Sequence, residues 1–114
     1  RSLPEAEKIY SASGFTPGRS IALPHLKAVG REISIGGRAI ILMQPAADSP
    51  ASDLLKNQPA TFAGYSLRVQ DLSKAKLVLA ENGMANMVEH AGPFGRSLLV
   101  PPAKAGGSWL ELFE

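Results

Sequence analysis

The sequence predicts a small α+β domain made of two copies of one unit, a helix followed by strands. Three observations support this: a segment near the start recurs about 70 residues later, both copies show helical periodicity, and the composition is globular. The 114 residues are 45% hydrophobic and 19% charged, which suits one modest core and argues against disorder.

The first repeated element is a helix. At an offset of 69, Ser2 matches Asp71 and Gly14 matches Gly83. Serine and aspartate are preferred helix N-caps, and glycine is typical just past a helix end. The apolar positions between them have helical spacing: Leu3, Ala6, Ile9 and Tyr10 in the first copy, and Leu72, Ala75, Val78 and Leu79 in the second. Both stretches therefore predict amphipathic helices of about three turns.

Strands follow each helix. Gly36–Gln44 matches Gly106–Glu114, each a strand entered through a Gly-Gly turn, and a further strand precedes each one, at Arg31–Ile35 and Arg96–Val100. The second copy also has a strand before its helix, Phe62–Val69. Its counterpart in the first copy would lie before Arg1 and is absent from this sequence.

These elements divide the chain into a first module at 1–45, a linker at 46–60 and a second module at 61–114. The linker is rich in Ala, Ser, Asp and Pro, and Asp53–Lys56 suggests a short helical turn.

Charge and composition exclude several functions. The net charge is +2 and the basic residues are scattered, which argues against nucleic acid as a partner. No apolar run reaches the roughly 20 residues of a membrane helix, so no membrane partner is expected. There is no cysteine, which excludes disulfides and thiolate sites and fits a cytoplasmic protein.

The order of these elements resembles the vicinal oxygen chelate superfamily, which includes glyoxalase I, bleomycin-resistance proteins and extradiol dioxygenases. The likeness rests on Leu3–Phe15, Gly64–Gly83 and Arg96–Glu114. It implies two βαβββ modules, the first lacking its opening strand, whose mixed sheets form a U-shaped cup with the helices outside and a small-molecule ligand inside. It also implies a homodimer, with exchange of modules as one arrangement.

Strand alternation predicts which side chains line that cup. Tyr65, Leu67 and Val69 should pack on the helix, as should Leu110 and Leu112. The opposite positions then face the ligand: Gly64, Ser66, Arg68, Trp109, Glu111 and Phe113, joined by Ile41 and Met43 of the first module. This lining is mostly apolar with a few polar groups, the usual character of a small-molecule site.

The resemblance also implies four inward positions for metal ligands, usually His and Glu. One lies on the absent strand, and the others fall at Ile41, Gly64 and Glu111. A single carboxylate cannot hold a catalytic divalent ion, which needs about three protein ligands. The expected cofactor is therefore none, with Glu111 a ligand only if a divalent metal is present.

Each candidate residue has a structural reading beside the functional one. Glu111 is either a general base or a carboxylate paired with Arg68, and Arg68 is either a clamp for an anion or that partner. Trp109 and Phe113 either stack on a ligand or pack the core. The two histidines, His25 and His90, are expected to be solvated loop side chains.

Three functions remain open. The first is a glyoxalase- or bleomycin-resistance-like protein that binds a small, partly apolar ligand without a complete metal site. The second is a metal-dependent lyase, isomerase or dioxygenase. The third is an interaction module whose open first-module edge pairs with another chain.

Overall fold

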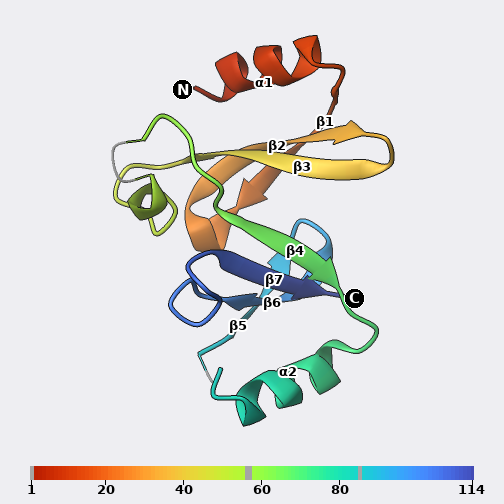
Figure 1. Ribbon diagram of the computed structural model, residues 1–114, viewed down its shortest axis with the longest axis vertical. Helices are drawn as coiled ribbons and strands as arrows, with labels where there is room; N and C mark the ends of the chain where they lie inside the picture. Colours follow the sequence, from red (N-terminus) through yellow and green to blue (C-terminus); the bar gives the residue numbers. More distant parts are fainter. Residues whose placement is uncertain (1, 56–57, 85) are drawn as a thin grey trace. The chain divides into compact units, whose positions relative to one another are not determined.

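The computed structural model describes residues 2–55, 58–84 and 86–114. The chain forms two compact units, Arg1–Thr61 and Phe62–Glu114. Within these residues each unit contains one α-helix and one β-sheet (Figure 1). The predicted α+β class and the helix-plus-strands repeat are confirmed.

The first unit begins with its helix and continues into an antiparallel sheet of order β1-β2-β3. Its elements are α1 (Leu3–Ala12), β1 (Thr16–Leu23), the 3₁₀ turn η1 (Pro24–Leu26), β2 (Ala28–Ile35) and β3 (Arg38–Pro45). Gly36 and Gly37 join β2 to β3 with φ of 55° and 74°, a left-handed backbone that glycine adopts without strain.

The second unit has a four-stranded mixed sheet of order β4-β7-β6-β5. Its elements are β4 (Gly64–Arg68), α2 (Leu72–Glu81), β5 (Val88–Gly92), β6 (Gly95–Val100) and β7 (Trp109–Phe113). β4 runs parallel to β7, and the other two pairs are antiparallel. The crossover from β4 through α2 therefore places an additional strand on the outer edge of β7.

The sequence analysis did not predict two of the strands, β1 and β5. β1 contains Pro17 and Gly18, and its pairing register with β2 shifts between Pro17 and Ser20. β5 is only five residues long and has no apolar alternation. With these two strands each helix is followed by three strands, as in the βαβββ modules that the resemblance implies.

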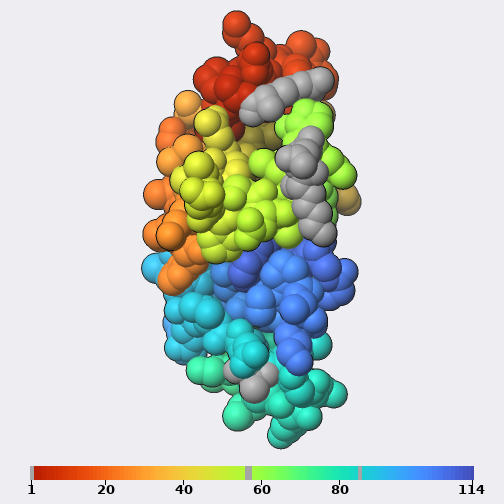
Figure 2. All heavy atoms as spheres, turned by 90° about the vertical axis from the view of Figure 1, so that its left-hand side faces the viewer, coloured from red at the N-terminus to blue at the C-terminus, as the bar shows by residue number. Residues whose placement is uncertain are grey.

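The segment predicted as the linker contains a 3₁₀ turn, η2, at Ser52–Leu54. This is close to the predicted turn at Asp53–Lys56, of which Lys56 lies outside the described residues. Ser49 and Ala51 of this segment are buried. Figure 2 shows its atoms, in yellow-green, packed against neighbouring residues of the first unit.

The apolar core of the second unit lies between α2 and the sheet. Leu72 at the start of α2 packs with Leu98 of β6 and Leu112 of β7, and the side chains around this cluster are Val69, Ala75, Leu79, Met87 and Leu110. The predicted packing of Val69, Leu110 and Leu112 on the helix is thus confirmed. Neither helix in the described residues is long and apolar enough to cross a membrane.

Candidate functional site

The predicted lining residues of the second unit lie on one face of its sheet. The parallel ladder pairs Gly64 with Trp109, Ser66 with Glu111, and Arg68 with Phe113. Paired residues point to the same side of a sheet, and residues two apart along a strand share that side. Since Leu110 and Leu112 pack toward α2, these six residues lie on the face away from the helix.

Glu111 lies at the centre of this face. Its Oε2 accepts a 2.7 Å hydrogen bond from the Ser66 hydroxyl. Its Oε1 is buried and has no hydrogen-bond partner among the described residues. That oxygen packs so closely on Gly92 that a Cβ at this position would collide with it. The carboxylate is therefore held in place from both sides, by the Ser66 hydroxyl and by a glycine backbone.

His90 joins this cluster and was missed by the sequence analysis. Its Nε2 lies 3.9 Å from Glu111 Oε1 and 3.2 Å from the Ser97 hydroxyl oxygen. The His90 side chain is 7% exposed and that of Glu111 is 11% exposed, so the expectation of a solvated histidine is wrong. The reason is that β5 pairs His90 with Ser97 on the Glu111 face. The position of His90 could have been predicted only by recognising β5 as a strand.

The geometry of the cluster limits its chemistry. Ser97 and Glu111 both approach the same imidazole nitrogen, Nε2. A nucleophile relay needs the serine on one ring nitrogen and the carboxylate on the other. The cluster instead places an imidazole 3.9 Å from a carboxylate in a mostly desolvated site, where polar and charged groups interact more strongly than in water.

The end of the face near Arg68 is aromatic. The Phe113 ring stacks on Phe94, with centroids 4.7 Å apart, and the Arg68 guanidinium carbon lies 5.7 Å from the Phe113 centroid. Arg68 and Glu111 do not form the ion pair that the sequence left as one reading, because Ser66 and His90 surround the carboxylate. At the other end, Trp109 Nε1 is buried without a hydrogen-bond acceptor in the described part of the chain.

The helix side of the same sheet differs from the prediction in one respect. Tyr65 and Leu67 are 45% and 49% exposed and do not pack on the helix. α2 lies over β6, so the edge strand β4 stays uncovered on this side. Tyr65 stacks instead on Phe62, with centroids 6.4 Å apart.

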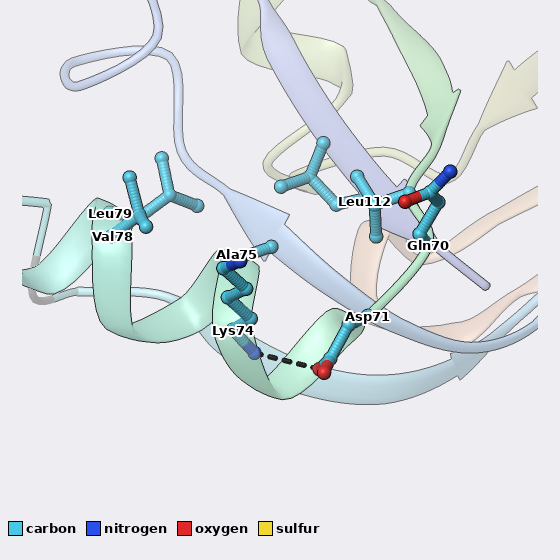
Figure 3. Close-up of a pocket in the computed structure, with 8 residues that line it drawn as sticks. Gln70, Asp71, Lys74, Ala75, Val78, Leu79 and Leu112 are labelled. Carbon is cyan, nitrogen blue, oxygen red and sulfur yellow. Dashed lines mark hydrogen bonds between the residues drawn. The ribbon is translucent and has the colours of Figure 1, made fainter.

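A concave region of about 620 Å³ opens beside α2 on this helix side (Figure 3). It is lined by Val69, Gln70, Asp71, Lys74, Ala75, Val78, Leu79 and Leu112. Its carboxylate, on Asp71, already accepts the Lys74 backbone amide as the helix cap. The polar side chains of this groove, Gln70, Asp71 and Lys74, are solvent-exposed, whereas the His90 and Glu111 side chains on the other face are mostly buried.

Ile41 and Met43 lie in the first unit, on β3. Arg31 and Leu42 are register partners, and Arg31 pairs with Glu7 of α1, so that face of the first sheet is the helix side. Ile41 and Met43 alternate with Leu42 and therefore point away from α1, as predicted. Their contact with a ligand stays a prediction.

Within the described residues, the positions that the resemblance implies for metal ligands do not form a set that fits a catalytic divalent ion. Gly64 offers no side chain, and a Cβ there would collide with the Trp109 carbonyl oxygen. Ile41 has no donor atom, and one oxygen of Glu111 is already bound by Ser66. Within residues 2–55, 58–84 and 86–114, no group of three or more His, Cys, Asp or Glu could hold a metal.

Comparison with solved structures places this geometry in a known fold. The chain is similar to methylmalonyl-CoA epimerase from Mycobacterium tuberculosis, with a TM-score of 0.84 and 22% identity over 97% of this chain and 79% of that one. It is also similar to a hypothetical protein from Bacillus halodurans, with a TM-score of 0.80 and 20% identity over 97% and 84%. This chain therefore shares the glyoxalase-like fold of these proteins.

A third structure with the glyoxalase-like fold is a variant of methylmalonyl-CoA epimerase from Streptomyces coelicolor, in complex with 2-nitronate-propionyl-CoA. It has a TM-score of 0.82 and 16% identity over 98% of this chain and 88% of that one. Neither a protein-family profile nor a curated protein matches the sequence. At these identities the likeness establishes the fold.

Proposed function

We propose that this protein binds a small, partly apolar organic molecule without a resident metal, on the sheet face that carries Glu111. The observation that carries the proposal is the Ser66–Glu111–His90 cluster, a mostly buried polar group on a face otherwise formed by side chains such as Leu99 and Phe113. The Glu111 carboxylate accepts a hydrogen bond from Ser66 and no other among the described residues, so it keeps acceptor capacity for a ligand's hydrogen-bond donor.

The fold supports this proposal by analogy. A solved neighbour holds 2-nitronate-propionyl-CoA, so this architecture can accept an organic ligand. In our proposal Gly64, Ser66, Arg68, Trp109, Glu111 and Phe113 contact the ligand. The homodimer and the cytoplasmic location are further parts of the proposal.

Fragment screening of the isotope-labelled protein by NMR tests this. We expect partly apolar fragments to shift the backbone amides of β4 and β7. Ser66→Ala removes the 2.7 Å bond to Glu111 and should weaken the best fragment about tenfold. Ser73→Ala, on the exposed surface of α2, is the matched control and should leave its affinity unchanged. Shifts confined to the groove beside α2 would refute the proposed site.

A second candidate is an enzyme in which Glu111 and His90 exchange a proton with the ligand. Their 3.9 Å approach in a desolvated cluster favours this over a passive carboxylate. The metal-dependent form of this candidate needs ligands beyond the described residues. Elemental analysis of protein purified without chelator separates the two forms. A near-stoichiometric divalent ion would support the metal-dependent enzyme and contradict the metal-free proposal.

A further inference from the structure

The positively charged guanidinium of Arg68 lies beside the candidate site, and no carboxylate of the described residues pairs with it. Arg19, Arg31 and Arg96 each pair with a glutamate at 3.0–3.4 Å. Arg68, although exposed, has no ion pair in the described part of the chain, and its guanidinium lies beside the Phe113 ring. A planar guanidinium kept over an aromatic surface presents its N–H edge for bidentate binding of an anion.

Glu111 places a carboxylate on the same sheet face as Arg68, two residues along the β4–β7 pair. Ser66–Glu111 and Arg68–Phe113 are successive same-face rungs of the β4–β7 pair. Two residues of strand separate these rungs by about 6.6 Å. Glu111 Oε1 is without a hydrogen-bond donor in the described residues. A cation and an unsatisfied carboxylate therefore share one face at the spacing of a short molecule.

Resting on the proposed function, we propose that the ligand class is a short organic anion with a hydrogen-bond donor, hydroxyl or ammonium, at its far end. Its anionic group binds Arg68, its body lies along Phe113, and its donor reaches Glu111. The carboxylate at Glu111 repels a second anion at that end. The site should therefore prefer molecules with unlike ends to dicarboxylates of the same length.

Four probes of one chain length test this: 5-aminopentanoate, pentanoate, glutarate and pentylamine, titrated by NMR at neutral pH. We expect 5-aminopentanoate to bind at least about tenfold more tightly than pentanoate or pentylamine, since each lacks one charge-assisted contact. Glutarate should bind more weakly than pentanoate.

Two variants assign the ends. Arg68→Gln should abolish the preference of 5-aminopentanoate over pentylamine, and Glu111→Gln should abolish its preference over pentanoate. Arg96→Gln, on the helix side of the same sheet, should change neither ratio. Equal binding of all four probes at β4 and β7 would overturn this ligand class and leave the proposed binding face intact. If no probe binds while apolar fragments still shift that face, the ligand class again fails alone.

Discussion

The two units use the same helix-and-strand plan but hold their helices differently. Leu72, the first residue of α2, is 1% exposed and sits in an apolar cluster. Its counterpart Leu3 in α1 is only partly buried, and no residue of α1 is fully buried. Polar contacts tie α1 to its sheet instead: the Leu3 amide donates to Gln44 Oε1 at 2.8 Å, and Arg31 pairs with Glu7 at 3.1 Å.

The residue that follows the fourth strand accounts for part of this difference. β4 lies on the outer edge of β7 and leads into Val69, whose amide donates to the Phe113 carbonyl at 2.7 Å and whose side chain joins the core around Leu72. The corresponding edge of β3 has no strand partner in the described residues. Val69 therefore adds apolar surface to the core beneath α2, whereas α1 is held to its sheet by a hydrogen bond and an ion pair.

The largest expected effect comes from truncating the matched leucines. Leu72→Ala should lower the free energy of unfolding by about 2–5 kcal/mol, because it empties a fully buried position. Leu3→Ala should cost about 1 kcal/mol or less, because Leu3 remains partly hydrated. Urea unfolding followed by circular dichroism measures both. Equal losses would show that the two helices are held alike and would break the comparison.

The next effect concerns the seam between β4 and β7. Gly64→Ala should cost about 1–3 kcal/mol, because the new Cβ collides with the Trp109 carbonyl oxygen and pushes the strands apart. Amide hydrogen exchange should then accelerate in β4 and β7. Gly30→Ala in the first sheet is the matched variant, where the Cβ would lie 2.9 Å from the Leu42 carbonyl oxygen and exchange should accelerate in β2 and β3 instead.

The sequence predicted the elements that have local signals. Asp71 and Gly83 marked the ends of α2, and the Gly36-Gly37 and Gly106-Gly107 turns marked the strands that follow. The face of β7 followed from alternation alone, so Trp109, Glu111 and Phe113 were correctly placed together. These assignments succeeded because each depends on residues only a few positions apart.

The rest depends on contacts that local patterns do not encode. His90 lies beside Glu111 only because β5 pairs with β6, and the short sequence of β5 gives no strand signal. Tyr65 and Leu67 alternate correctly but stay exposed, because α2 lies over β6 rather than over β4. Which part of a sheet a helix covers is a property of tertiary packing.

A smaller effect is expected at the helix caps. The Asp71 carboxylate accepts the Lys74 amide at 2.8 Å, so Asp71→Ala should cost about 1 kcal/mol. Ser2→Ala should cost less, because the Ser2 backbone amide keeps its 2.8 Å bond to Glu5 Oε2. Thermal unfolding of the two variants side by side tests this order. A larger loss for Ser2→Ala would mean that α1 depends on its cap more than α2 does.

The smallest expected effect concerns the exposed ion pair between Lys76 and Glu89. Lys76 of α2 hydrogen-bonds Glu89 of β5 at 3.1 Å and, with a lesser contribution from Arg96, holds the pKa of Glu89 below its ordinary value. A carboxyl whose pKa is lower in the folded state adds stability above the unfolded pKa and loses it as pH falls through the folded pKa. Because Glu89 is solvent-exposed, this contribution should be close to undetectable in unfolding experiments.

Carboxyl titration by NMR is sensitive enough to resolve the Glu89 interaction. Lys76→Gln should raise the pKa of Glu89 toward its ordinary value, and Arg96→Gln should raise it less, since Lys76 is the larger cause. Glu7→Gln is the counterpart in the first unit, where the partner Arg31 is 33% exposed. If α1 depends on its polar contacts, Glu7→Gln should lower the free energy of unfolding measurably. Lys76→Gln should change only the pKa of Glu89. Indistinguishable unfolding curves for the two variants would mean that α1, like α2, is held mainly by its own apolar side chains.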